Sequence, residues 1–111
     1  MLKISISSIF VDDQDKALAF YTQKLGFIKK DDVPAGEYRW LTLVSPAEPE
    51  GTELLLEPNG HPAAKAYQEQ IFADGIPAMM FTVDDIHQEY ERLVQNGVRF
   101  TMVPTQVGNV T

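Results

Sequence analysis

The segment 10-FVDDQDKALAFYTQKLGF-27 determines the fold, because it joins the end of an apolar strand to an amphipathic helix and a glycine stop. Leu18 and Leu25 lie at helical spacing on one face. Gly26 suits the left-handed conformation that ends many helices. A related segment, 83-VDDIHQEYERLVQNGVRF-100, follows later with the same Val-Asp-Asp start and a glycine after its helix. The chain therefore contains the same strand-to-helix unit twice.

Each unit begins with a pair of aspartates, Asp12 and Asp13 in the first and Asp84 and Asp85 in the second. Asp is favoured at a helix N-terminus, where it accepts hydrogen bonds from free amides and opposes the positive end of the helix dipole. The simplest role of both pairs is therefore to cap the two helices.

The composition is that of a globular protein. The chain has 111 residues, of which 44% are hydrophobic and 23% charged, so we expect a single domain over residues 1–111. Nine basic and sixteen acidic residues give a net charge of −7. That charge repels nucleic acid and anionic membranes, and neither is expected as a partner.

The chain has no cysteine. Disulfides, thiolate metal sites and a cysteine nucleophile are therefore excluded. No apolar leader and no apolar run of membrane length is present. These features predict a soluble, cytoplasmic protein.

Hydrophobic periodicity and the positions of Gly and Pro predict two similar modules. Module one spans about residues 1–58, a linker helix about 61–74, and module two about 76–111. The predicted strands are 3–11, 27–30, 37–45 and 52–58 in module one, with 76–83 and 98–103 in module two; the predicted helices are 13–25, 61–74 and 85–96.

The first unit resembles the entry unit of the vicinal oxygen chelate superfamily, which contains glyoxalase I, bleomycin-resistance proteins and extradiol dioxygenases. The matching residues are Val11, Asp13, Phe20, Tyr21, Leu25 and Gly26. The resemblance implies an α+β fold of two βαβββ modules, whose curved mixed sheets form a cleft. It also implies a homodimer.

The chain departs from the family pattern at its C-terminus. Family members continue after a segment like 108-GNVT-111 into strands that complete the second sheet. Here the sequence ends at Thr111. We therefore expect an incomplete second module, and a natural gene product that extends further.

The resemblance also places the family's metal ligands on this sequence. They fall on Ile6, Leu55 and Ala78, and the fourth lies beyond Thr111. Aliphatic side chains have no lone pair for a metal, so we predict no metal and no cofactor. A divalent metal remains the alternative, because many relatives use one as a Lewis acid.

Two carboxylates are weak catalytic candidates. Strand alternation puts Glu53, Leu55 and Glu57 on one face, so both glutamates would flank the cleft position. A carboxylate in an apolar cleft can act as a general base. The simpler interpretation is that both are solvated at the ends of the strand.

The two histidines do not form a metal site. His61 begins the linker helix and His87 lies one turn into the second-module helix, among charged residues. Neither has a His or Glu at ligand spacing on a shared strand. A cap and a solvent-facing side chain are the expected roles.

Apolar and aromatic side chains are the main feature of the predicted cleft. Small-molecule sites are mostly apolar with a few polar contacts. Trp40 is notable because it alternates with Leu41 and Leu43, which favour the helix-covered face; the alternative is that Trp40 is a core residue. The predicted ligand-binding residues are Phe10, Tyr38, Trp40, Leu55, Glu57 and Met80.

Two functions follow from the resemblance. The first is a metal-free protein that binds a small organic ligand in an aromatic-lined cleft, similar to the bleomycin-resistance members. The second is a divalent-metal-dependent lyase, isomerase or dioxygenase, against which Ile6, Leu55 and Ala78 count. A purely structural or protein-interaction role is a third, weaker alternative.

Overall fold

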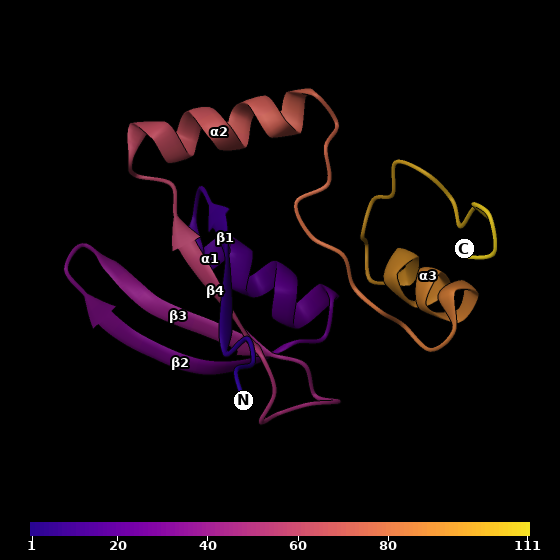
Figure 1. Ribbon diagram of the computed structural model, residues 1–111, viewed down its shortest axis with the longest axis horizontal. Coiled ribbons are helices and arrows are strands. Elements are labelled where there is room, and N and C mark those ends of the chain that lie inside the picture. Colours follow the sequence, from indigo (N-terminus) through magenta and orange to yellow (C-terminus); the bar gives the residue numbers. More distant parts are fainter. The chain divides into compact units, whose positions relative to one another are not determined.

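The computed structural model describes residues 1–111 and divides them into two compact units, Met1–Ala78 and Met79–Thr111. Figure 1 shows both units, and each is described by itself.

The first unit contains the βαβββ order that the sequence predicts for module one. A helix follows the first strand, three strands follow the helix, and a second helix closes the unit (Figure 1). The elements are β1 (Ile6–Val11), α1 (Gln14–Ala19), the π-helical turn η1 (Phe20–Lys24), β2 (Ile28–Ala35), β3 (Tyr38–Val44), β4 (Glu53–Pro58) and α2 (Pro62–Ala73).

The four strands form one mixed sheet in the order β1-β4-β3-β2. β1 pairs with β4 in parallel, and the other neighbours are antiparallel. The α+β fold class is therefore confirmed. The two outer edges belong to β1 and β2, and the register of β2 shifts between Lys29 and Asp31, which leaves Lys30 as a bulge.

Strand β2 is longer than expected. The predicted strand ended at residue 30, yet residues 31–35 also pair with β3, as far as Ala35. An edge strand tolerates Pro34 because the missing N–H faces away from the ladder. The turn instead centres on Gly36, whose φ of 66° lies in the left-handed region.

The hydrophobic core lies between α1 and one face of the sheet. Leu41, Leu43 and Leu56 are 0% exposed and form a cluster with Val11. Leu18 of α1 and Tyr21 of η1 pack against this cluster. Odd-numbered residues of β3 thus face the helix, as strand alternation predicts, and burial raises the pKa of the Tyr21 phenol.

The predicted helix 13–25 is confirmed as α1 followed by η1. The Asp13 carboxylate accepts a hydrogen bond from the Lys16 amide at 3.0 Å and caps the helix. Within the π-helical turn that ends this helix, the Thr22 hydroxyl donates a hydrogen bond to the Leu18 carbonyl at 2.7 Å. The chain then reverses at Gly26, whose φ is 93°.

A helix forms where residues 61–74 were predicted to be helical, as α2. His61 caps it, because its Nδ1 accepts a hydrogen bond from the Ala63 amide at 3.0 Å. Gln68 donates to the Phe10 carbonyl at 2.9 Å and accepts from the Asn59 side chain at 2.7 Å. These bonds hold α2 beyond the ends of β1 and β4 (Figure 1).

The second unit contains the predicted helix, α3 (Ile86–Gln95). The Asp85 carboxylate accepts hydrogen bonds from two amides of the first turn, both at 3.1 Å. Gly97, with a φ of 87°, ends the helix as expected. His87 is exposed, also as expected.

The strands expected at residues 76–83 and 98–103 are not formed, and this part of the prediction was wrong. A strand requires a hydrogen-bonded neighbour, and the only pairing in this unit is an isolated bridge between Val107 and Val110. Contact between the Tyr90 and Phe100 rings, 4.7 Å apart, places the second segment against α3. None of the helices has the length and apolar character needed to span a lipid bilayer.

Candidate functional site

A hollow of about 160 Å³ lies where β3 and β4 separate. The ladder between these strands has only the pairs Thr42–Leu55 and Leu43–Leu54. From Thr42 back toward Tyr38 on β3, and from Leu55 onward to Pro58 on β4, the two strands continue without pairing to each other. The hollow is lined by Ala35, Tyr38, Arg39, Trp40, Leu55, Leu56, Glu57 and Pro58.

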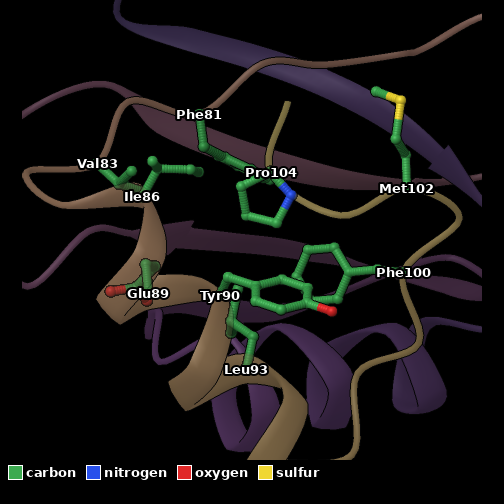
Figure 2. Close-up of a pocket in the computed structure, with 9 residues that line it drawn as sticks. All are labelled: Phe81, Val83, Ile86, Glu89, Tyr90, Leu93, Phe100, Met102 and Pro104. Carbon is green, nitrogen blue, oxygen red and sulfur yellow. The ribbon is translucent and has the colours of Figure 1, made fainter. Parts of the chain in front are cut away.

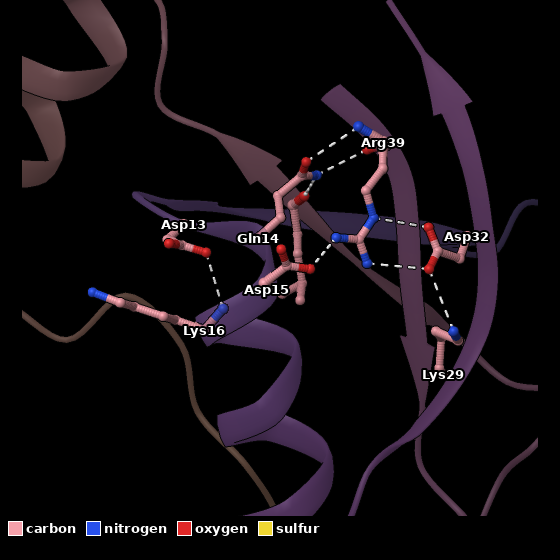
Figure 3. Close-up of polar contacts among 8 residues, drawn as sticks. Asp13, Gln14, Asp15, Lys16, Lys29, Asp32 and Arg39 are labelled. Carbon is pink, nitrogen blue, oxygen red and sulfur yellow. Dashed lines mark hydrogen bonds and ion pairs between the residues drawn. The ribbon is translucent and has the colours of Figure 1, made fainter. Parts of the chain in front are cut away.

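Gln14, the first residue of α1, spans the separated strands from the helix side (Figure 3). Its side-chain nitrogen donates to the carbonyls of Arg39 at 2.8 Å and Leu56 at 2.9 Å. Its oxygen accepts from the Arg39 amide at 3.1 Å. Gln14 is 9% exposed. One buried side chain therefore supplies hydrogen bonds that the interrupted ladder does not, and the hollow does not collapse into ordinary strand pairing.

The Arg39 guanidinium is held by two carboxylates. It donates to both Asp32 oxygens, at 2.9 and 3.1 Å, and to Asp15 at the start of α1 (Figure 3). Lys29 also contacts Asp32, at 3.3 Å. The hydrogen bond from Arg39, more than any other contact, lowers the pKa of Asp32, and hydrogen bonds to Asp32 and then Asp15 raise the pKa of Arg39. These charges compensate one another on the side of the sheet that α1 covers.

Trp40 and Tyr38 lie on the opposite face of β3 from the core. Trp40 is 42% exposed whereas its neighbour Leu41 is 0% exposed, so Trp40 is not a core residue. Tyr38 is 45% exposed and lies against Gly60. A Cβ atom on Gly60 would come within 2.6 Å of the Tyr38 hydroxyl. The glycine therefore makes room for the Tyr38 ring at the rim of the hollow.

Glu57 and Glu53 lie on the same face of β4 but have different surroundings. Glu57 lines the hollow, is half-buried, and its carboxylate has no ion-pair or hydrogen-bond partner in the chain. Glu53 Oε2 lies 3.7 Å from the Lys30 ammonium, while Oε1 is buried without a hydrogen-bond partner. Of the two catalytic candidates, only Glu57 can act in the hollow.

The structure brings together four of the six predicted ligand-binding residues. Tyr38, Trp40, Leu55 and Glu57 all line the hollow. Phe10 lies beside them as the register partner of Glu57 on β1, but does not line it. Met80 belongs to the second unit, is 93% exposed and does not line this hollow.

The positions of the family's metal ligands do not suit a metal. Ile6 on β1 and Leu55 on β4 lie on the open face by alternation and offer only aliphatic carbon. Ala78 is equally without a donor. No group of three or more His, Cys, Asp or Glu side chains is arranged to hold an ion. The residues present therefore do not fit the family's metal.

A second hollow, of about 250 Å³, lies within the Met79–Thr111 unit. Figure 2 shows that the helix α3 supplies one of its walls. It is almost entirely apolar, and Glu89, its one charged residue, is paired with Arg92. The lining residues are Phe81, Val83, Ile86, Glu89, Tyr90, Leu93, Phe100, Met102 and Pro104. Besides the paired Glu89, its only polar side-chain group is the Tyr90 hydroxyl, so the hollow offers mainly apolar surface.

The sequence analysis missed three residues that shape the site: Gln14, Arg39 and Gly60. Only Gln14 has a sequence signal, because it stands directly after the capping aspartates where the helix meets the sheet. The roles of Arg39 and Gly60 depend on contacts with residues distant in the sequence, which no local pattern encodes.

The βαβββ order, the parallel pairing of β1 with β4 and the open-faced hollow define a glyoxalase-like class of fold. The model of the Glyoxalase/Bleomycin resistance protein/Dioxygenase superfamily matches residues 3–111. The chain belongs to this superfamily.

Several known proteins are similar to this chain. The uncharacterized protein YurT of Bacillus subtilis strain 168 is 64% identical over 110 residues, which cover 99% of this chain and 87% of YurT. The crystal structure of UcmS2 is 37% identical with a TM-score of 0.84, over 96% of this chain and 84% of UcmS2. TnmS3, an antibiotic binding protein from Streptomyces sp. CB03234, is 24% identical with a TM-score of 0.74, over 97% and 80%. This last likeness concerns the fold.

Proposed function

We propose that the protein binds a small organic ligand at the hollow between β3 and β4, without a metal ion. The observation that carries this proposal is the hollow itself, where separated strands expose Tyr38 and Trp40 beside the unpaired Glu57. Ligand sites combine apolar and aromatic walls with a few polar groups that fix orientation. A hollow of about 160 Å³ accommodates part of a planar molecule, with the remainder above the open face of the sheet.

Membership of the superfamily is consistent with this function. The antibiotic binding protein TnmS3 has the same fold, so the architecture is compatible with binding an organic molecule. The identity of the ligand is not carried over from that protein.

The alternative is a divalent-metal-dependent enzyme of the same superfamily. It is favoured by one observation, that Glu53 and Glu57 lie on one face of β4 on either side of Leu55. Glu53, however, is already paired with Lys30. A site left with Glu57 alone would bind a divalent cation weakly, because such ions require several oxygen ligands.

Binding is tested with Trp40, which is the only tryptophan and so reports on the hollow directly. A panel of planar organic compounds is screened for a saturable change in fluorescence. We expect at least one to bind. Trp40→Ala, whose binding is measured by calorimetry because the fluorescent reporter is removed, should weaken it by about two- to tenfold, the loss of one aromatic contact. If no compound perturbs Trp40, the proposed function is wrong.

The metal question is tested separately by calorimetric titration with nickel, zinc, manganese and iron(II). We expect no tight one-to-one binding. Tight binding that Glu57→Gln abolishes would show a rebuilt metal site and would favour the enzyme. Glu53→Gln is the matched control on the same face of β4.

Two further features stay predictions. A homodimer, expected from the resemblance, is tested by sedimentation of the purified protein. A cytoplasmic location is tested by fractionation of cells that express it.

A further inference from the structure

The charges around the hollow are not balanced. Arg39 is the only basic residue that lines it, and its guanidinium is committed to Asp32 and Asp15 (Figure 3). Lys30 is paired with Glu53, which lies on the same face of β4 as Glu57. Neither Arg39 nor Lys30 is therefore left as an unpaired cation.

Glu57 is the charge that remains. Its carboxylate lines the hollow, is half-buried and has no partner in the chain. A partly buried carboxylate loses part of its hydration, which an opposite charge restores more effectively than a neutral group. The net charge of −7 adds a long-range attraction for cations.

The aromatic walls favour the same kind of ligand. The ring faces of Trp40 and Tyr38 carry the negative part of the aromatic quadrupole, and tryptophan attracts cations most strongly. Both rings and the Glu57 carboxylate line one hollow. A planar body with a delocalised positive charge can contact all three at once. An anion would face both the carboxylate and the ring faces unfavourably.

We infer that the ligand of this site is an organic cation with a planar, apolar body, such as an N-alkylated heteroaromatic. This inference rests on the proposed function, because it names the class of ligand for the same hollow. It assigns Glu57 the role of charge partner and Trp40 and Tyr38 the role of stacking surface.

The experiment uses three probes of nearly equal shape and different charge. N-methylquinolinium carries a permanent positive charge, 1-methylnaphthalene is its neutral counterpart, and 1-naphthoate is an anion. Each is titrated into isotope-labelled full-length protein while the single indole N–H resonance of Trp40 is followed. We expect the cation to bind about tenfold more tightly than the neutral probe, and the anion more weakly than either.

Variants assign the effect to one residue. Glu57→Gln keeps the shape of the side chain and removes its charge, so the affinity for N-methylquinolinium should fall about tenfold while that for 1-methylnaphthalene is unchanged. Glu53→Gln, two residues away on the same face, should leave the preference for the cation intact. In the wild-type protein, added salt should weaken the binding of the cationic probe and of neither other probe.

The outcomes separate the inference from the proposed function. Equal binding of the cation and the neutral probe would overturn the ligand class while the binding function stands. A preference for the cation that survives Glu57→Gln would overturn the role of Glu57. If none of the three probes shifts the Trp40 resonance, and the wider panel also fails, the proposed function itself is wrong.

Discussion

The side chain of Gln14 forms two hydrogen bonds with the main chain of Arg39, donating to its carbonyl at 2.8 Å and accepting from its amide at 3.1 Å. This is the pattern with which a residue of a neighbouring strand would pair with Arg39. A helix residue thus takes the place of a strand at the point where β3 leaves β4.

Replacement of Gln14 by leucine should destabilise the protein by about 2–4 kcal/mol, because it leaves the Arg39 amide and the carbonyls of Arg39 and Leu56 without partners in a buried place. Chemical denaturation measures the loss. Gln23, exposed on the same helical segment, provides the control, since Gln23→Leu should change stability by less than about 0.5 kcal/mol. Equal stability of the two variants would show that Gln14 does not hold the strands.

Trp40→Ala and Leu41→Ala should differ sharply although the residues are adjacent. Leu41 is 0% exposed, so its truncation should cost about 2–5 kcal/mol through lost burial and a cavity. Trp40 is 42% exposed, so its truncation to alanine should lower the free energy of unfolding by only about 1 kcal/mol. Thermal melts of both variants decide the matter. A Trp40→Ala loss as large as that of Leu41→Ala would place the indole in the core.

Gly60→Ala should displace the Tyr38 ring, because the new methyl group would come within 2.6 Å of the phenol oxygen. We expect a cost of about 1 kcal/mol and weaker binding of any ligand that stacks at the rim. Tyr38→Phe removes the obstructing oxygen, so the double variant should recover most of the stability in a double-mutant cycle. Additive effects of the two changes would contradict the contact.

Asp32→Asn should lower stability slightly near neutral pH, because it removes the ion pair with Arg39. Arg39 lowers the pKa of Asp32 below its ordinary value of 3.8. The stabilisation is therefore fully present above pH 3.8 and is lost as the pH falls through the lowered pKa. Melting temperatures of wild type and variant should converge in that acidic range. A difference that stays constant through that range would contradict the contribution of the ion pair.

The first module was predictable because its signals are local. The first helix was predicted from its cap Asp13, its stop Gly26 and the helical spacing of Leu18 and Leu25. Strand alternation placed Leu41 and Trp40 on opposite faces of β3. The strands of the second module were not predictable in the same way. Residues 76–83 and 98–103 have suitable side chains, but neither segment pairs with a neighbouring strand, and the only bridge in the Met79–Thr111 unit joins Val107 to Val110.

The site was predictable only in part. Alternation placed Tyr38, Trp40, Leu55 and Glu57 on one face, and all four line the hollow. The existence of the hollow depends on where two strands separate, which is a property of pairing and of the Gln14 side chain. Nothing in the sequence of either strand indicates that their ladder ends after two residue pairs.

The bulge at Lys30 and Pro34 make the outer side of β2 a poor template for another strand. The outer side of β1 has neither a proline nor a charged residue over Ile6–Val11. Within the Met1–Ala78 unit, only the β1 edge of the sheet is therefore suited to pairing with an additional strand. If two copies of the chain paired through their β1 edges, the combined sheet would have a β2 edge on each side. Neither β2 edge favours the addition of another strand, so assembly would stop at a dimer and would not continue into a fibre.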